Sequence, residues 1–243
     1  MNHLFNLSAF AYRLLKLIPA RSAHGGKVVR WAIVEQLYFT GIQALSIVIP
    51  VSLITGTMLI SQFTWVSEEY DLGKIILTLV VREFGPMITA FVVILRSASA
   101  VTIEVCYMNI LNEIDSIEMS GIDPMRLVSF PRLVGITISI LSLFIVFDLI
   151  AIIGGYVVVW AGTDLPVGNF LSQAGKSFSI EDMVVGIIKA ICFGFTITVV
   201  SLYHGFNSKR QITQIPPAVS RAAIECFIFC IVINIFISTV FYL

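Results

Sequence analysis

Residues 104–132 read EVCYMNILNEIDSIEMSGIDPMRLVSFPR and form the longest polar interruption in a strongly apolar chain. Within residues 108–119, apolar side chains recur at steps of two or three, with polar side chains mostly opposite, which predicts an amphipathic helix. Gly121 is placed to end this helix, and Pro124 to lie in the first turn of the next element. We therefore expect a short helix and a tight turn between two hydrophobic segments. This arrangement is either a solvated loop or a docking element for a soluble partner.

The composition indicates a membrane protein. Of the 243 residues, 58% are hydrophobic and 12% are charged, which is about half the charged share of a soluble domain. Several apolar runs reach the ~20 residues that cross a bilayer core. We expect five spans, at residues 42–66, 75–105, 135–160, 183–203 and 221–243. The predicted fold is an all-α polytopic membrane protein, and its net charge of zero gives no indication of a nucleic-acid partner.

The first 40 residues predict a segment at the membrane surface. Polar and basic side chains, including Arg13 and Lys16, mark one face of the first stretch, and leucines and a phenylalanine lie on other faces, as in a helix that lies in the interface. Trp31 and Tyr38 are suited to the headgroup region of a second interfacial segment. We therefore divide the chain into an interfacial helix and elbow at residues 1–40 and a membrane domain at residues 41–243.

Lysine and arginine residues predict the orientation of the spans. Eleven of the fifteen lie on one side of the predicted membrane, namely Arg13, Lys16, Arg21, Lys27, Arg30, Arg96, Arg126, Arg132, Lys209, Arg210 and Arg221. Only Lys74 and Lys176 lie on the other side. Because these residues are enriched in cytoplasmic loops, we expect the N-terminus and residues 104–132 in the cytoplasm. Five spans then place the C-terminus outside.

Several kinds of site are not indicated. The four cysteines form no CxxC motif and the histidines are scattered, so we expect no metal site. The only Gly-Lys-Ser is residues 175–177, where a phosphate-binding loop would need glycine in place of Phe170. Neither a serine elbow nor an HExxH motif is present. The chain itself therefore predicts no nucleotide or other cofactor.

Charged residues inside the predicted spans are expected to pair, because an isolated charge near the bilayer centre costs about 2.5–3.5 kcal/mol on insertion scales. At ~1.5 Å per residue, Glu83 and Lys189 lie at similar depths, roughly 12 Å and 10 Å from the outer surface. Asp148, roughly 18 Å deep, is expected to join these two residues in one charge cluster and is the rival partner of Lys189. Arg82 points about 100° away from Glu83 on a helix, toward another contact or a lipid headgroup. In the alternative, each charge snorkels or meets water.

The outer half of the first span carries one mostly apolar stripe. Its members are Thr55, Met58, Leu59, Gln62, Phe63 and Val66, at steps of three and one. A flexible methionine on an apolar surface suits acyl chains, although ordinary helix packing or plain lipid exposure would give the same pattern.

The central stretch and its flanks resemble the permease family known as MlaE or YrbE, the membrane subunits of MCE-type lipid ABC transporters. The matching segments include REFGP at residues 82–86, RSASA at 96–100, NEIDSIEM at 112–119, GIDPMR at 121–126 and PR at 131–132. Single residues and short motifs also match: Glu104, Asp148, Gly154-Gly155, Lys189, Tyr203-His204-Gly205 and Ser220-Arg221. The resemblance extends from about residue 33 to the end of the chain.

The resemblance implies a homodimer in a bacterial inner membrane that carries phospholipid between inner and outer membranes. It implies ABC ATPase subunits that bind ATP and Mg on the cytoplasmic face, an MCE-domain protein on the periplasmic face and, in some members, a STAS-domain protein. The coupling surface for the ATPase would then be Glu113, Asp115, Glu118, Asp123 and Arg126. The lipid site would combine the stripe with Arg82 and Glu83. The competing functions are an intramembrane lipid-modifying enzyme and a membrane scaffold without transport.

Overall fold

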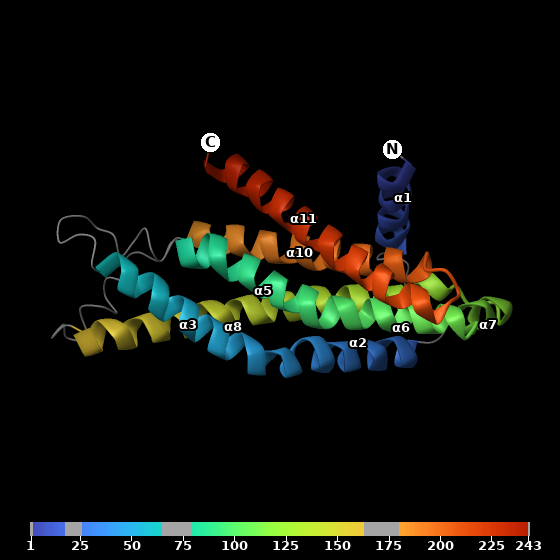
Figure 1. Cartoon of the computed structure of the whole chain (residues 1–243), viewed down its shortest axis with the longest axis horizontal. Helices are drawn as coiled ribbons and strands as arrows, with labels where there is room; N and C mark the ends of the chain where they lie inside the picture. Colours follow the sequence, from blue (N-terminus) through green and yellow to red (C-terminus); the bar gives the residue numbers. More distant parts are fainter. Residues whose placement is uncertain (1, 18–25, 65–78, 163–179, 243) are drawn as a thin grey trace.

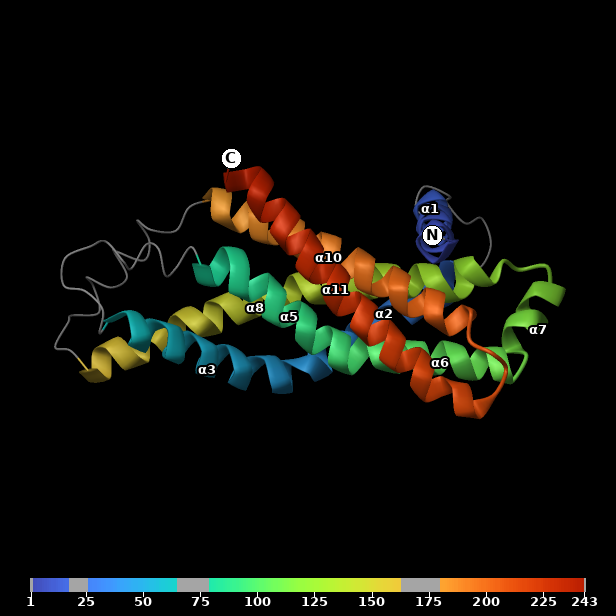
Figure 2. The ribbon, with the colours of Figure 1, turned by 45° about the horizontal axis from the view of Figure 1, so that its top comes forward.

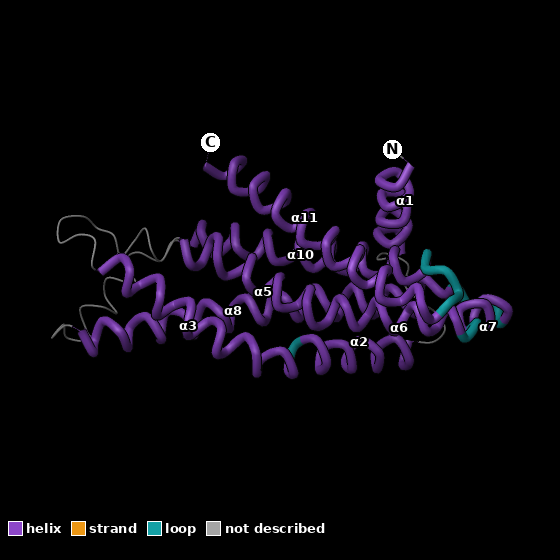
Figure 3. The backbone as a smooth tube through the Cα atoms, in the orientation of Figure 1, coloured by secondary structure: helices purple, strands orange, loops and turns teal. Residues whose placement is uncertain are grey.

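The computed structural model describes residues 2–17, 26–64, 79–162 and 180–242, and these are almost entirely helical, with no strand among them (Figure 1). Short turns join the helices within the described part of the chain (Figure 3). The α-helices are α1 (Asn2–Leu17), α2 (Gly26–Thr40), α3 (Leu45–Thr64), α5 (Gly85–Val93), α6 (Ser99–Ile110), α7 (Glu113–Met119), α8 (Phe130–Gly162), α10 (Ile180–Phe206) and α11 (Ile215–Tyr242). Two 3₁₀ turns, η1 (Ile42–Ala44) and η5 (Ile212–Gln214), and three π-helical turns, η2 (Val80–Phe84), η3 (Ile94–Ala98) and η4 (Met125–Ser129), complete them.

Five stretches of helix are long and apolar enough to cross a membrane, which confirms the all-α polytopic fold. They are Lys27–Leu59, Val80–Ile110, Met125–Gly155, Glu181–Phe206 and Ile212–Phe241. The third and fifth spans begin earlier than we predicted, because the helix continues through Arg126, Arg132 and Arg221, at which the apolar pattern of the sequence stops. A helix satisfies its own backbone hydrogen bonds, so a charged side chain near its end does not terminate it.

Helix α8 is the central element of the bundle and packs against α2, α3, α5 and α10. Its buried face includes Ile140, Phe144 and Phe147. Small residues bring the neighbouring helices close, since a Cβ at Gly56 of α3 would lie only 2.2 Å from the carbonyl oxygen of Ala151 in α8. Close backbone approach through small residues is typical of helix packing in membranes.

The two N-terminal helices take different directions. Helix α1 lies across the long axis of the bundle and packs against α10, where its Leu14 is fully buried (Figure 2). Helix α2 follows the long axis beside α8 and leads through η1 into α3 (Figure 1). The segment at residues 31–39, which we predicted as a second interfacial element, therefore lies in a helix continuous with the first span. The division of the chain at residue 40 stays a prediction.

The central stretch folds into a helical hairpin tip at one end of the bundle, hereafter the α7 end (Figures 1 and 2). The single helix predicted for residues 108–119 is wrong in one respect: Met108 belongs to α6, and the chain turns before α7 begins. Asn112 takes the left-handed conformation with φ 58°, which asparagine tolerates better than most residues, and this breaks the helix into two.

The predicted end of α7 is confirmed. Gly121 has φ +75°, its N–H donates to Glu118 O at 2.9 Å, and Ile122 N–H donates to Ile117 O at 3.3 Å. These two bonds form the Schellman pattern that closes a helix on a glycine. Asp123 Oδ1 then accepts a hydrogen bond from Met125 N–H at 2.9 Å and so opens the next helical segment, as expected from the Asp123-Pro124 pair.

Candidate functional site

The second span begins with a π-helical turn, η2, which is followed by Pro86. In η2 the N–H of Gly85 donates to Val80 O, five residues back instead of four. Pro86 has no N–H, so the carbonyl of Arg82 cannot receive the hydrogen bond that an α-helix would supply there. Such π-turns often occur at functional sites. Here the turn leaves the Arg82 carbonyl available to a side chain from another helix.

That side chain is Lys189 of α10, which is fully buried. Its Nζ lies 3.0 Å from Arg82 O, 2.8 Å from Glu83 Oε2 and 2.7 Å from Ser238 Oγ. An ammonium group has three donors, and each has an acceptor within hydrogen-bond distance. The predicted pairing of Glu83 with Lys189 is thus present in the structure.

Glu83 is equally well surrounded. Ser238 Oγ donates to Glu83 Oε1 at 2.8 Å, and Asn234 Nδ2 donates to Oε2 at 3.1 Å. Asn234 and Ser238 are one turn apart on α11 and so share a face of that helix. We call Glu83, Lys189, Asn234 and Ser238 the ion-pair cluster. It joins η2, α10 and α11 at the end of the bundle opposite α7, hereafter the far end.

Arg82, the neighbour of Glu83 in the sequence, has an acidic partner of its own. Arg82 Nη1 forms a second ion pair with Asp182 Oδ1 at 3.2 Å, at the start of α10. This agrees with the prediction that Arg82 points away from Glu83 to another contact. Its predicted contact with lipid stays a prediction.

Asp148, the rival partner of Lys189, lies buried in α8 against the second span. A Cβ at Gly85 would lie only 2.2 Å from Asp148 Oδ1, so the absence of a side chain at Gly85 makes room for this carboxyl group. Asp148 Oδ1 is buried without a hydrogen-bond partner in the described structure. Among the ion pairs of the described residues, Lys189 is paired with Glu83 and not with Asp148.

The predicted lipid stripe lies on α3, partly outside the region whose side chains are described. Leu59 packs against the core, Thr55 is half-buried and Met58 is exposed. Gln62 and Phe63 belong to α3 but their side chains are not among those described, and Val66 lies outside the described residues. The described members therefore form the edge of the packed face of α3, and their contact with lipid stays a prediction.

The predicted coupling residues gather at the α7 end. Arg210, from the turn between α10 and α11, donates to Asp115 at 2.6 and 2.8 Å and to Asn112 Oδ1 at 2.9 Å. Glu113 and Glu118 are exposed, and Asp123 caps the following turn. Arg126 is half-buried in η4. No residue of α7 is buried, so the helix offers its surface for contact.

The structure also brings together two histidines that are far apart in the sequence. His204 Nε2 lies 2.9 Å and His3 Nε2 3.7 Å from the carboxylate of Glu225. Their ligand atoms lie within 4.8 Å of one another, so among the described residues this is the group that could hold a metal ion. In the structure the three side chains link α1 to α10 and α11. The absence of a metal site stays a prediction.

The sequence did not predict several of the side-chain interactions at these sites. Asn234 and Ser238 form a polar pair at i and i+4 in an apolar helix, a pattern that predicts one polar helix face but not what it faces. Asp182 and Arg210 carry charge near the ends of α10 and gave no signal of their partners. The Gly-Lys-Ser at residues 175–177 lies outside the described residues.

Comparisons with known proteins agree with the sequence and the fold. The family described as Permease MlaE matches residues 33–240. The chain belongs to the MlaE permease family. It is 33% identical over 200 residues to the intermembrane phospholipid transport system permease protein MlaE of Haemophilus influenzae, covering 79% of this chain and 76% of that protein. It is 26% identical over 214 residues to a probable ABC transporter permease protein of Rickettsia conorii, covering 86% and 83% of the two chains.

A further relative comes from Pyropia yezoensis. The probable ABC transporter permease protein ycf63 of Pyropia yezoensis is 25% identical over 182 residues, or 72% of this chain and 68% of that protein. The MlaE match covers three of the five candidate membrane segments in full and most of the first and last, and it includes the ion-pair cluster and α7.

Proposed function

We propose that this chain is the permease subunit of an ATP-driven transporter that moves phospholipid between inner and outer membranes. The observation that carries the proposal is the 33% identity to the phospholipid permease of H. influenzae over 79% of the chain. Five membrane-spanning helices with charges paired inside them suit a path for a lipid with a polar headgroup. The chain is a permease and leaves ATP hydrolysis to a partner.

The orientation follows from the distribution of positive charge. The N-terminus and the α7 end face the cytoplasm and the C-terminus faces the periplasm, because Lys and Arg gather at the α7 end. The assembly is a homodimer in the bacterial inner membrane. ABC ATPase subunits that bind ATP and Mg dock on α7, and an MCE-domain protein binds the periplasmic face. A STAS-domain protein is an optional further subunit.

Helix α7 is built to transmit motion from the ATPase. Only the turns at residues 111–112 and 120–124 separate it from α6 and η4. The ion pair between Asp115 and Arg210 also ties α7 to the turn before α11. A shift of α7 therefore pulls on four membrane helices, α6, α8, α10 and α11. Such a physical connection is what coupling between an ATP site and a lipid path requires.

In the far half of the bundle, different residues contact the acyl chains and the headgroup of the lipid. The edge of α3 that carries Thr55, Met58 and Leu59 contacts acyl chains, since it offers a flexible apolar surface. Arg82 and Glu83 lie at the depth where a headgroup or its phosphate passes, held in place by Asp182 and Lys189. Photo-crosslinkers at Leu59 and Phe63 should therefore capture lipid, and one at Ile60, which lies on α3 outside the stripe, should capture much less.

The function is tested by reconstitution. The permease is placed in vesicles with its ATPase and MCE partners, and transfer of a fluorescent phospholipid to acceptor vesicles is measured with and without ATP. The proposal requires ATP-dependent transfer that needs this chain. Normal ATP hydrolysis by a complete complex with no ATP-dependent transfer would contradict it.

A further inference from the structure

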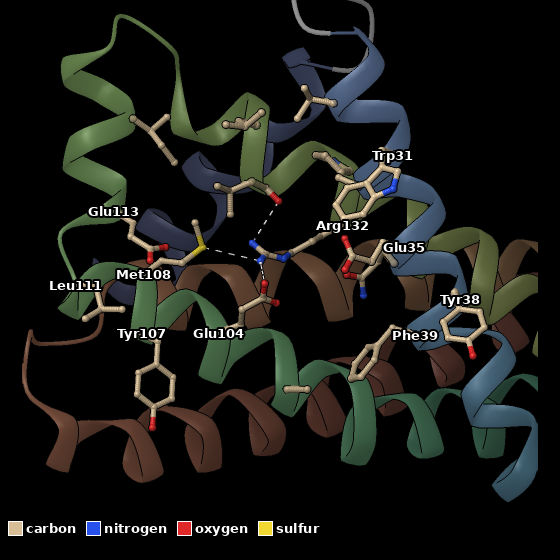
Figure 4. A pocket seen from close by; sticks show the side chains of 18 of the residues that line it. Trp31, Glu35, Tyr38, Phe39, Glu104, Tyr107, Met108, Leu111, Glu113 and Arg132 are labelled. Carbon is tan, nitrogen blue, oxygen red and sulfur yellow. Dashed lines mark hydrogen bonds and ion pairs between the residues drawn. The ribbon is translucent and has the colours of Figure 1, made fainter.

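A cavity lies at the α7 end, separate from the ion-pair cluster. It has a volume of about 940 Å³ and is bounded by α2, α6, α7 and the start of the α8 segment (Figure 4). This volume falls within the range of pockets that bind organic ligands, about 300–1,000 Å³. None of the residues of the proposed headgroup and acyl-chain path lines it.

One wall of this cavity is aromatic. Helix α2 contributes Trp31, Tyr38 and Phe39, and α6 contributes Tyr107 across the opening. Trp31 is 67% exposed and Tyr38 55% exposed, an unfavourable state for large rings in water. Exposed tryptophan and tyrosine are typical of the level where lipid headgroups meet water. The mouth of the cavity therefore lies at the headgroup level of the leaflet at the α7 end.

The polar lining carries more negative than positive charge. It has three carboxylates, Glu35, Glu104 and Glu113, and one guanidinium, Arg132. Arg132 is nearly buried and pairs with Glu104 at 2.8 Å, whereas the Glu104 side chain is 60% exposed. Figure 4 shows Arg132 between Glu104 on α6 and Glu35 on α2. An added ligand thus meets one fixed cation and an excess of two negative charges.

We infer that this cavity binds the headgroup of a zwitterionic phospholipid, one that carries an ammonium group beside its phosphate. Carboxylates and the faces of Trp31 and the tyrosines attract an ammonium group, and a guanidinium attracts a phosphate. The apolar part of the lining, such as Val28 and Leu111, suits the start of the acyl chains. A lipid with net negative charge would meet the excess carboxylates and bind less well.

This inference rests on the proposed function and names the lipid class taken from the leaflet at the α7 end. It also gives the site a link to the ATPase, because α7 itself contributes Glu113 and Ile117 to the lining. A bound headgroup touches the same short helix on which the ATPase is proposed to dock. Lipid occupancy and ATPase docking would then affect each other's free energy.

The experiment uses the full permease–ATPase complex in nanodiscs that contain phosphatidylethanolamine with a photoactivatable diazirine near the headgroup. We expect cross-links on residues 28–39 and 104–111. Glu35→Lys should reduce capture by about fivefold, the effect of one partly exposed charge contact, and Glu35→Gln by less. Because Glu35 is exposed on α2, both variants should fold and assemble.

Two matched variants serve as controls. Lys209→Glu reverses an exposed charge in the turn between α10 and α11 that does not line the cavity, and Tyr12→Ala removes an exposed ring from α1. Both should leave capture unchanged, whereas Tyr38→Ala should reduce it. A phosphatidylglycerol probe with the same diazirine should be captured several-fold less than the phosphatidylethanolamine probe.

Several results would overturn the inference. They are equal capture of the two probes, capture that Glu35→Lys does not change, and cross-links from α2 to a second copy of the chain or to the ATPase across this cavity. ATP-dependent lipid transfer is measured in the same samples to separate the two proposals. If the wild-type complex transfers lipid but no probe is captured at this cavity, only the inference is wrong. If the wild-type complex shows no ATP-dependent transfer, the result counts against the proposed function.

Discussion

Ion pairs are buried at one end of the bundle and exposed at the other. At the far end, Glu83 and Lys189 are enclosed by three helices, and the ammonium group has an acceptor for each donor. At the α7 end, the pair of Asp115 and Arg210 is about half exposed, and α7 buries none of its residues. A buried pair is costly to break, because it leaves an uncompensated charge, whereas an exposed pair contributes little to stability. At the far end, buried charges therefore hold the helices together, whereas the α7 end is an exposed surface that a partner could bind.

The sharpest way to break this comparison is to remove one charge of the buried pair. Lys189→Met leaves Glu83 without its cation and should destabilise the permease by about 3–5 kcal/mol, measured by thermal unfolding in detergent. Lys189→Glu should impair transport, and Glu83→Lys in the same chain should partly restore it.

The rival swap is the control for that experiment. Asp148→Lys with Lys189→Asp should restore nothing, because Asp148 lies against Gly85 and has no ion pair with Lys189 among the described residues. If neither swap recovers function while both proteins insert and assemble, the charges act separately and the Glu83–Lys189 pair does not hold the helices together.

A smaller effect is expected from the polar residues that α11 adds to the cluster. Ser238→Ala removes an acceptor of Lys189 and a donor to Glu83, and should cost about 1–3 kcal/mol, the penalty for buried polar groups left unsatisfied. Ser120→Ala is the matched change at the α7 end, where the exposed hydroxyl bonds only Ser116 O. Equal thermal shifts for the two variants would remove the distinction between the ends.

Gly85→Ala tests how tightly the far end is packed. The new methyl group would meet Asp148 Oδ1 at 2.2 Å and should cost about 1–3 kcal/mol through overpacking. Asp148→Ala in the same chain should relieve much of this cost, since it removes the carboxyl group that the methyl meets. Additive effects of the two substitutions, read from a double-mutant cycle, would show that the contact is not the source of the strain.

The smallest effect on stability belongs to the α7 end. Glu113→Lys with Asp115→Lys should change the unfolding free energy by less than about 1 kcal/mol, because both side chains are exposed or half-exposed. The same double variant should abolish co-purification of the ATPase. A complex that purifies intact and hydrolyses ATP normally would show that α7 is not the docking element.

Particular residues show how far sequence reasoning reached. The depths of Glu83 and Lys189 follow from a constant rise of ~1.5 Å per residue, and their pairing could be predicted from depth and sign. The end of α7 at Gly121 followed from the needs of a left-handed residue. The break at Asn112 was missed, because the apolar pattern continues across it and the turn forms where Arg210 bonds Asn112 and Asp115.

By itself, the sequence determined the number of spans, the position of each charged residue along its span and the polar tip between the second and third spans. These properties depend on hydropathy and on distance along one helix, which are local. Only the tertiary structure decided that Asn234 and Ser238 complete the ion-pair cluster, that Arg82 meets Asp182, and that α2 and α6 enclose a cavity around Arg132. Those contacts depend on how each helix is rotated and which helix lies beside it, and packing between distant segments sets both.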